Sequence, residues 1–198
     1  PIKNIFPNSY IEHVFPAFAD CSKIANITIP SSVKSIGYNA FAGCFLLNKL
    51  PIPSSVTSIK QYTIKNYQSI EQITISPDEY SINDYEYSGF SSLRQITIPN
   101  SIRKIGEGSF RDCWLVEQIN IPDSVVSIEK EAFKGCKRMN QITIPASVTS
   151  IGSGTFCNCE SLERIEIQSK LKSIENDLFN NCTKLKQIII PETVSYIG

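Results

Sequence analysis

Residues 98–166 read IPNSIRKIGEGSFRDCWLVEQIN, IPDSVVSIEKEAFKGCKRMNQIT and IPASVTSIGSGTFCNCESLERIE, three consecutive copies of one 23-residue pattern. The same pattern runs through the 198-residue chain without a change of phase. The isoleucine or leucine that opens its apolar segment stands at Ile27, Leu50, Ile73, Ile96, Ile119, Ile142, Ile165 and Ile188. A fixed period of this length is the signature of a solenoid, whose unit buries its apolar face only by stacking on its neighbours.

The apolar positions of each copy form columns that keep their spacing. One column holds isoleucine in every copy after the first: Ile36, Ile59, Ile82, Ile105, Ile128, Ile151, Ile174 and Ile197. Alternation as in Ile96-Thr97-Ile98 predicts a short strand with one buried face, and Pro99 ends it because proline has no N–H to donate to a ladder. Residues 148–152 predict a second short strand, and residues 132–139 predict one helical turn because their apolar side chains lie three and four apart.

We therefore expect a right-handed solenoid of about eight coils, in which the eight Ile-x-Ile segments form one parallel sheet. Residues 1–198 are expected to form a single domain, with residues 1–23 as a degenerate first repeat. The chain starts at Pro1 and ends at Gly198, one residue past an interior position. This favours the interpretation that the chain is a piece of a longer array.

The motif Leu93-x-x-Ile96-x-Ile98 resembles the leucine-rich repeat. The continuation I-P-x-S-V-x-x-I-G-x-x-A-F-x-x-C is similar to the BspA-like subtype, known from surface proteins of bacteria and protists. The chain departs from the general motif where asparagine is expected, with Ser32, Ser55, Asp78, Ser101, Ser124, Ser147, Lys170 and Thr193. A serine hydroxyl can satisfy turn backbone groups in the same way. The resemblance implies a leucine-rich repeat solenoid on the cell surface or outside the cell.

Composition argues against several functional classes. The 19 basic and 19 acidic residues cancel, so no overall field favours nucleic acid or an anionic membrane. No apolar run approaches the length that spans a bilayer, so membrane insertion of this segment is not expected. His13 is the only histidine and falls in the isoleucine column. Because no phosphate-binding glycine motif or complete metal-ligand set is present, we expect neither an enzyme nor a cofactor.

Six of the seven cysteines share one position of the repeat: Cys21, Cys44, Cys113, Cys136, Cys159 and Cys182. Tyr67 and Phe90 hold that position in the intervening copies, which indicates a buried apolar site occupied by free thiols. A disulfide ladder is the alternative, since stacked strands lie about 4.8 Å apart. Cys157 stands outside the column and is expected to be the reactive thiol.

Two features are candidates for partner binding. The first is a pair of rows of mostly uncharged side chains that point outward from the sheet. One row includes Gln72, Gln95, Gln118, Gln141 and Arg164, and the other includes Thr97, Asn120, Thr143 and Glu166. These rows either serve solubility and cross-strand hydrogen bonding or bind an extended polypeptide or glycan. The second is the irregular stretch 61–90, which contains five of the eight tyrosines, Tyr80 and Tyr85 among them. Asp78, Asp84 and Glu86 make it acidic.

The tyrosines of this stretch, including Tyr62 and Tyr67, either compensate for missing core neighbours or form a contact surface, because binding hot spots favour tyrosine. Tyr80 and Tyr85 are the best candidates for exposure. Trp114 stands, like Phe45, at a mainly polar position and is a further candidate contact.

The leading hypothesis is a noncatalytic protein-binding or adhesion module of a cell-surface or secreted protein. Its partner would be a protein, such as a host or matrix protein, or a glycan. The alternative is an intracellular, cytoplasmic scaffold or regulatory subunit that docks an enzyme. Both ends present apolar columns without a polar cap, which predicts end-to-end self-association.

Overall fold

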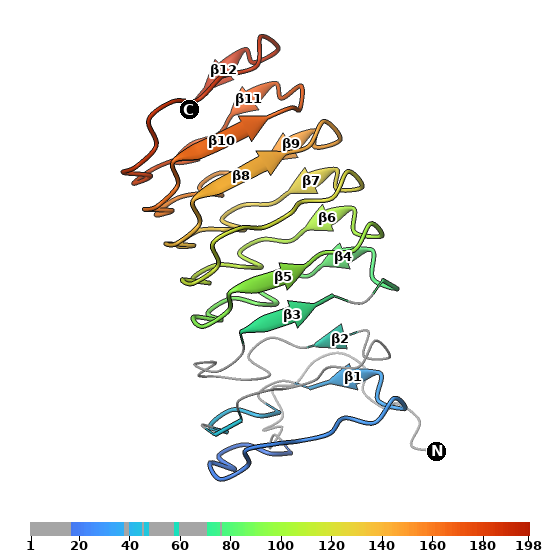
Figure 1. Cartoon of the computed structure of the whole chain (residues 1–198). Coiled ribbons are helices and arrows are strands. Elements are labelled where there is room, and N and C mark those ends of the chain that lie inside the picture. Colours follow the sequence, from blue (N-terminus) through green and yellow to red (C-terminus); the bar gives the residue numbers. More distant parts are fainter. Residues whose placement is uncertain (1–16, 38–39, 45, 48–57, 60–70, 76) are drawn as a thin grey trace, which may run out of the picture.

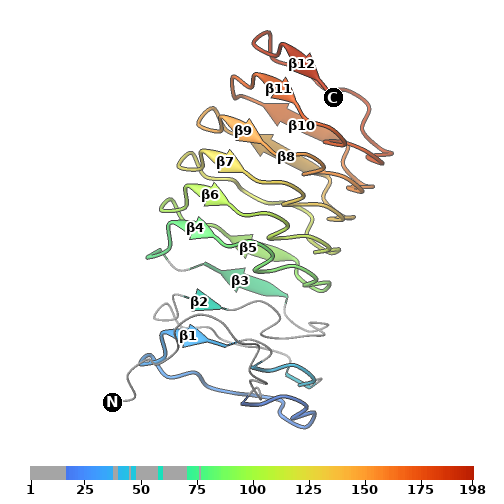
Figure 2. The ribbon, with the colours of Figure 1, turned by 180° about the vertical axis from the view of Figure 1, so that it is seen from behind.

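The computed structural model describes residues 17–37, 40–44, 46–47, 58–59, 71–75 and 77–198. The chain winds into a right-handed parallel β-solenoid whose coils stack from the N-terminal to the C-terminal end (Figure 1). The strands lie on two sides of the coils, and a turn-rich segment lies between them (Figure 2). His13, Phe45, Tyr62 and Tyr67 lie outside the described residues, as do most positions of the coil between β1 and β3.

The strands of the first side come from the Ile-x-Ile segments. They are β3 (Gln72–Thr74), β5 (Gln95–Thr97), β8 (Gln141–Ile144) and β10 (Arg164–Ile167). The strands of the second side are two-residue segments ending in the isoleucine column: β1 (Ser35–Ile36), β2 (Ser58–Ile59), β4 (Ser81–Ile82), β6 (Lys104–Ile105), β7 (Ser127–Ile128), β9 (Ser150–Ile151), β11 (Ser173–Ile174) and β12 (Tyr196–Ile197). The prediction of two short strands per coil is confirmed where β3, β5, β8 and β10 form, whereas Gln118 and Gln187 make only isolated bridges on the first side.

Strand pairing follows the sequence period, since Ile73 pairs with Ile96 and Ile142 with Ile165. The expectation of one continuous sheet from the Ile-x-Ile segments is nevertheless wrong. Strands β3–β5 and β8–β10 form separate two-stranded ladders, and isolated bridges join Gln118 and Gln187 to the second ladder. The longest ladder, β4-β6-β7-β9, lies on the other side. Ile119 and Ile121 stay buried in their columns, so core packing keeps the register where the ladder is interrupted.

The turn-rich side holds the coils together by alternating two kinds of backbone hydrogen bond. Glu131, Phe133 and Gly135 each donate an N–H to the next coil, at 3.0, 3.0 and 2.8 Å. The residues between them donate locally: the N–H of Lys134, for example, reaches the Glu131 carbonyl at 3.0 Å. The helical turn predicted for residues 132–139 is therefore absent and turns take its place, because the N–H groups of Phe133, Gly135 and Arg138 bond to neighbouring coils.

This alternation places two residues of each regular coil in the left-handed backbone region, four positions apart. The pairs are Tyr85/Gly89, Gly108/Asp112, Glu131/Gly135, Gly154/Asn158 and Asp177/Asn181. Glycine, asparagine and aspartate adopt this conformation at the lowest cost, which explains most of the pattern. Tyr85 and Glu131 are the bulky exceptions.

Hydroxyl groups link neighbouring coils at the turn that precedes the second strand. Ser124 Oγ, for example, donates to the Ile102 carbonyl at 2.7 Å.

The core is built from columns that run along the solenoid axis. Phe110, Phe133 and Phe156 are fully buried and stack with ring centroids 5.5 and 5.8 Å apart. From Cys44 onward, the cysteines of the neighbouring column donate their thiols to carbonyls of the ring column in the preceding coil. Cys136 Sγ, for example, lies 3.3 Å from the Phe110 carbonyl oxygen, and Cys159 Sγ lies 3.3 Å from that of Phe133. These bonds tie the two columns together across each coil boundary.

All seven cysteines, which lie among the described residues, are free thiols. The expectation of a buried thiol column is confirmed for Cys44, Cys113, Cys136 and Cys159, whereas Cys21 and Cys182 in the end coils are half-buried. Burial raises the pKa of the Cys113, Cys136 and Cys159 thiols, which keeps them protonated and unreactive. Cys157, which was expected to be the reactive thiol, is also buried, and this argues against that expectation.

Replacing Phe133 with alanine should destabilise the protein by about 3–5 kcal/mol, because the ring contacts a phenylalanine on each side and its removal leaves a cavity. Urea denaturation followed by circular dichroism measures the change. Trp114→Ala is the control, since that ring is exposed and its loss should cost about 0.5 kcal/mol or less. Equal losses in the two variants would contradict the assigned column.

A thiol-alkylating reagent should modify Cys21 in the native protein and leave Cys113, Cys136 and Cys159 unmodified until denaturant is added. The physical reason is that only the thiolate reacts, and burial suppresses both its formation and its access to the reagent. Peptide mapping by mass spectrometry after a short native pulse identifies the labelled positions. Labelling of Cys136 at the rate of Cys21 would overturn the prediction.

Candidate functional site

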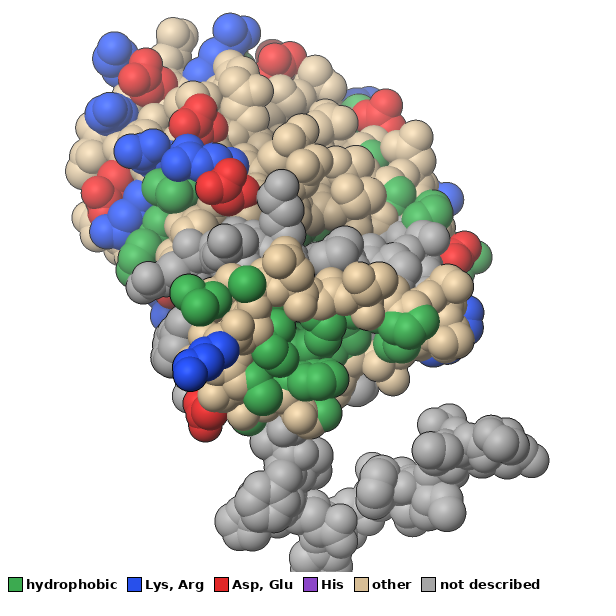
Figure 3. Space-filling model, turned by 60° about the horizontal axis from the view of Figure 1, so that its bottom comes forward, with side chains coloured by type: hydrophobic (Ala, Val, Ile, Leu, Met, Phe, Trp, Pro, Cys, Tyr) green, Lys and Arg blue, Asp and Glu red, His purple; other side chains and the backbone are tan. Residues whose placement is uncertain are grey.

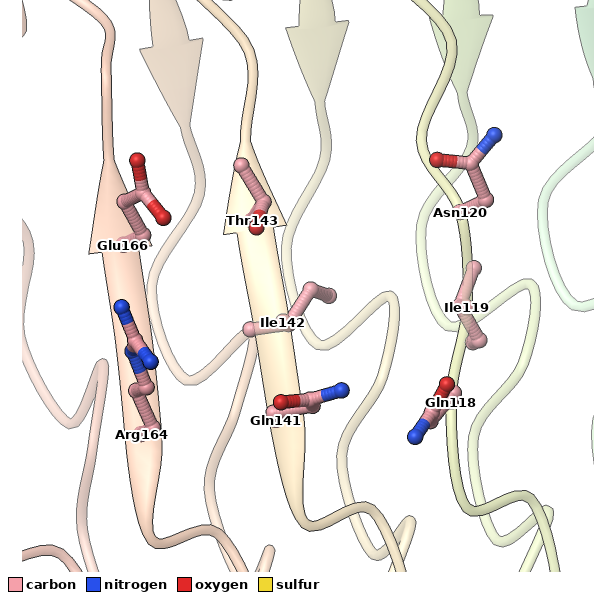
Figure 4. Close-up of a pocket in the computed structure, with 8 residues that line it drawn as sticks. All are labelled: Gln118, Ile119, Asn120, Gln141, Ile142, Thr143, Arg164 and Glu166. Atoms are coloured by element: carbon pink, nitrogen blue, oxygen red, sulfur yellow. The ribbon is translucent and has the colours of Figure 1, made fainter.

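The outward face of the first side carries a shallow depression of about 310 Å³. Its rim is polar and comes from three adjacent coils: Gln118 and Asn120, then Gln141 and Thr143 on β8, then Arg164 and Glu166 on β10 (Figure 4). Ile119 and Ile142 also line it. Because side chains alternate along a strand, burying Ile142 and Ile144 requires Gln141 and Thr143 to point outward.

Register places the polar side chains in two rows across the coils. Gln141 pairs with Arg164 and Thr143 with Glu166 on the next strand, while Gln118 bridges to Gln141. Each amide can both donate and accept hydrogen bonds, Arg164 supplies donors and Glu166 supplies acceptors. Glu166 accepts a bond from Gln168 Nε2 at 2.9 Å, which holds part of its acceptor capacity. We call the six polar residues of this depression, Gln118, Asn120, Gln141, Thr143, Arg164 and Glu166, the sheet-face site.

The structure brings two of the four proposed glutamines, Gln118 and Gln141, into this site. Gln72 and Gln95 pair with each other on β3 and β5 and are exposed on the same side, in the same row. The other four residues of the site, Asn120, Thr143, Arg164 and Glu166, belong to the two outward rows that strand alternation predicts from the sequence.

The tyrosine-rich stretch does not form one surface with its acidic residues. Tyr80 is 75% exposed, and its neighbour in the next coil is Arg103, whose N–H donates to the Tyr80 carbonyl at 2.8 Å. Tyr85 instead lies over Gly108 in the turn region, and its hydroxyl donates to Glu107 Oε1 at 2.6 Å. That bond raises the pKa of Tyr85 to about 12. Tyr85 is thus half-buried and engaged within the protein.

The acidic residues of the stretch differ in their surroundings. Asp78 is exposed, and Asp84, also exposed, accepts the Glu107 N–H at 2.8 Å. The expectation that Glu86 faces a partner is wrong, because the residue is only 5% exposed. Its Oε2 accepts bonds from the N–H and Nδ2 of Asn83, at 2.7 and 3.0 Å. The carboxylate therefore organises the turn.

Glu79 stands in a column that elsewhere holds valine, isoleucine or leucine and is half-buried. Burial, and secondarily the charge of Glu86, raises its pKa to about 7.

Trp114 is 48% exposed, as predicted for its polar position, but it lies outside the sheet-face depression. Within the described residues no three His, Cys, Asp or Glu side chains are grouped to hold a metal ion. That part of the chain also contains no helix with the length and apolarity to cross a bilayer.

The repeat architecture and its sequence place the chain in a known family. The profile of the BspA type leucine rich repeat region matches residues 3–116 and 103–198, in 6 copies. The chain belongs to this family of leucine-rich repeat proteins, whose solenoids are typically noncatalytic and suited to protein interaction. A search of curated proteins found no match.

Two solved structures, from Bacteroides ovatus and T. pallidum, agree with the fold. A leucine-rich repeat protein from Bacteroides ovatus is 35% identical with a TM-score of 0.60, over 82% of this chain and 36% of that chain. The T. pallidum leucine-rich repeat protein is 22% identical with a TM-score of 0.54, over 64% and 73%. A leucine rich cell surface protein from Faecalibacterium prausnitzii is 26% identical with a TM-score of 0.46, over 92% and 65%. The chain thus spans about a third of the length of the Bacteroides protein.

Glu79 should make stability depend on pH. Its pKa is raised in the folded state, so between about pH 4.5 and 7 the native protein binds more protons than the unfolded chain. Its stabilising contribution is therefore present at low pH and is lost as pH rises through 7. In the parent, this loss of unfolding free energy should be on the order of 1–2 kcal/mol, discounted for partial exposure. Glu79→Gln should abolish it, because the amide does not titrate.

Urea denaturation at pH 5 and pH 8 measures this effect as the difference in unfolding free energy between the parent and Glu79→Gln. The exposed Glu163→Gln is the matched control and should keep the pH dependence of the parent. If Glu79→Gln retains the full pH dependence, the assignment to Glu79 is incorrect.

Proposed function

We propose that the chain is a noncatalytic binding module of a cell-surface or secreted protein, and that it binds or adheres through the sheet-face site. The observation that carries this proposal is the depression formed by Gln118, Asn120, Gln141, Thr143, Arg164 and Glu166. Burial of the core requires only that these polar side chains point outward. In the structure, those of three neighbouring coils also line one depression together. A rigid scaffold that presents hydrogen-bonding groups without a catalytic set is suited to recognition.

The proposed ligand is an extended polypeptide segment of a host or matrix protein. An amide side chain offers one acceptor and two donors, which matches the C=O and N–H groups that an extended backbone presents. Arg164 and Glu166 add one donor and one acceptor of opposite charge, which would fix the direction of the bound segment. A glycan, whose hydroxyls also donate and accept, is the alternative ligand.

The surface or extracellular location rests on family membership, and an intracellular scaffold remains the competing proposal. Tyr80, with Asp78 nearby in sequence, is a second proposed contact, because a tyrosine that is 75% exposed offers apolar area and a hydroxyl. Tyr85, Asp84 and Glu86 contribute less to this contact, since their polar groups already bond within the protein. A further copy of the chain is another proposed partner, which would bind the ends of the solenoid and not the sheet-face site.

Selection of peptides from a displayed library of unstructured sequences, run in parallel with a glycan array, tests the sheet-face site. Binders of the parent should lose about tenfold or more in affinity for the variant Gln118→Ala/Gln141→Ala/Arg164→Ala, since hot-spot truncations cost about 2 kcal/mol or more. Thr149→Ala/Lys172→Ala is the control, because both residues are exposed in the turn before the second strand.

Peptide binders that discriminate between the two variants support the proposal, and glycan binders that do so support the alternative ligand. Equal binding of every selected ligand to the parent and the triple variant would move the site elsewhere. Binding that is lost only in Tyr80→Ala would assign recognition to the tyrosine contact. Thermal melts of each variant distinguish lost contacts from lost folding.

A further inference from the structure

The carboxylates beside the sheet-face site recur at every second coil. They belong to a further outward row, formed by the residue that precedes each glutamine or arginine of the site's first row, and we call it the border row. The border row consists of Glu71, Arg94, Glu117, Asn140, Glu163 and Lys186. All of these residues are exposed except Asn140, which is half-buried. Figure 3 shows acidic and basic side chains together along one side of the solenoid, beside an area of uncharged surface.

Backbone hydrogen bonds fix the spacing of the border row across the three coils of the sheet-face site. The Asn140 N–H donates to the Glu117 carbonyl at 3.1 Å, and the Glu163 N–H donates to the Asn140 carbonyl at 2.9 Å. Hydrogen-bonded strands lie about 4.8 Å apart, so carboxylates two coils apart recur about every 9.6 Å. In the part of the chain that the structure describes, neither Glu117 nor Glu163 forms an ion pair. Both charges therefore remain accessible to a partner.

The two extended conformations of a polypeptide differ in how well they match this spacing. In a β-strand, side chains on one face recur every two residues, which is about 6.7 Å. A polyproline II helix has three residues per turn and a rise of about 3.1 Å per residue, so every third side chain returns to the same face after about 9.3 Å. The polyproline II period is therefore the one that fits carboxylates placed two coils apart.

We propose that the sheet-face site binds a polyproline II segment that lies along the solenoid axis and carries lysine or arginine at every third residue. This inference rests on the proposed function and names the class of polypeptide that the site would bind. Successive cations of the segment would meet Glu117 and Glu163, at the first and last coils of the depression. The residues between the two cations would cross the coil of Gln141, where the border row has no charge.

The polar rows supply the hydrogen-bond donors that such a segment requires. A polyproline II backbone makes no internal hydrogen bonds, and each proline offers a carbonyl acceptor without an N–H donor. Gln118, Gln141 and Asn120 each carry an amide NH2 group, and Arg164 carries a guanidinium. These groups lie on three consecutive coils, so they can donate to successive carbonyls of a segment that crosses the coils (Figure 4).

The border-row residues between the carboxylates would set the register of the bound segment. A shift by one coil would place its cations beside Asn140 and, in the coils on either side of the depression, beside Arg94 and Lys186. Like charges at neighbouring positions repel, so the shifted alignment is disfavoured. A segment whose cations have a different spacing could meet only one of the two carboxylates at a time.

Fluorescence anisotropy with a labelled peptide of repeated Lys-Pro-Pro triplets tests this proposal. The parent should bind the peptide, and added salt should weaken binding because the ion pairs are exposed. A peptide of the same composition with its lysines in adjacent pairs should bind about threefold more weakly, since it loses one ion pair. Repeated Lys-Gly-Gly triplets keep the charge spacing but should also bind more weakly, because the flexible chain loses more conformational entropy on binding.

Glu117→Gln/Glu163→Gln should weaken binding of the Lys-Pro-Pro peptide about three- to tenfold, as expected for two exposed ion pairs. Glu160→Gln/Asp177→Asn is the control, because it removes two exposed carboxylates from the turn-rich side and should bind as the parent does. Glu117→Gln/Asn140→Glu keeps the net charge of the parent but places the carboxylates on adjacent coils. This variant should bind the peptide about threefold more weakly than the parent.

Thermal melts establish that each variant is folded. If Asn140→Glu unfolds the protein, the peptide with paired lysines still tests the charge spacing on the parent. Equal binding of the Lys-Pro-Pro peptide to the parent and to Glu117→Gln/Glu163→Gln would overturn the inference. Equal binding of the two lysine-proline peptides to the parent would also overturn it, since overall charge alone would then account for binding.

Failure of the parent to bind the Lys-Pro-Pro peptide would reject this class of ligand but not the proposed function. The proposed function would still stand if peptides selected from the displayed library bind the parent and lose affinity for the triple variant of the sheet-face site. If no selected ligand discriminates between the parent and that triple variant, the proposed site and this inference fail together.

Discussion

The structure depends on one constraint, a constant coil length that lets backbone groups of each coil meet those of the next. On the turn-rich side, alternate N–H groups cross to the neighbouring coil, as from Phe133 to the Thr155 carbonyl at 3.0 Å. On the other two sides, the strands pair in the same 23-residue register. One additional residue in a coil would move its N–H groups away from their carbonyl partners in the next coil. It would also move its apolar side chains out of the core columns. Uniform length therefore follows from hydrogen bonding as much as from apolar packing.

The regular coils show which positions this constraint leaves open. Inward positions repeat isoleucine, phenylalanine and cysteine because each must fill the same space beneath the same neighbour. Outward positions are restricted only by strand geometry, so Gln141 can be followed by Arg164 in the same row without a change in fold. We propose that recognition by such a scaffold lies in those rows. The family match defines the architecture, and the outward side chains form the proposed sheet-face site.

The irregular coil around residues 77–90 shows how the fold absorbs departures from its own pattern. Tyr87 takes the place of phenylalanine and stacks on Phe110 with centroids 5.4 Å apart. Glu79 and Glu86 put carboxylates where other coils have apolar or small groups, and burial raises the pKa of Glu79. Tyr85 adopts a left-handed backbone that glycine occupies in the next coil, and its ring fills the space above Gly108.

The sequence by itself determined the solenoid, its register, the buried thiols and the outward glutamine row, because each follows from a residue type repeated at a fixed spacing. Only the tertiary structure decided features that depend on bonds between coils. Turns replace the helical turn of residues 132–139 because their N–H groups find better partners across the coil boundary. Glu86 turns inward because Asn83 offers two donors there, and Tyr85 is engaged because Glu107 lies one coil away. Glu107 is distant from Tyr85 in the sequence, and Asn83 is a partner of Glu86 in one turn only. Neither pairing recurs at the repeat spacing, so the sequence pattern does not reveal it.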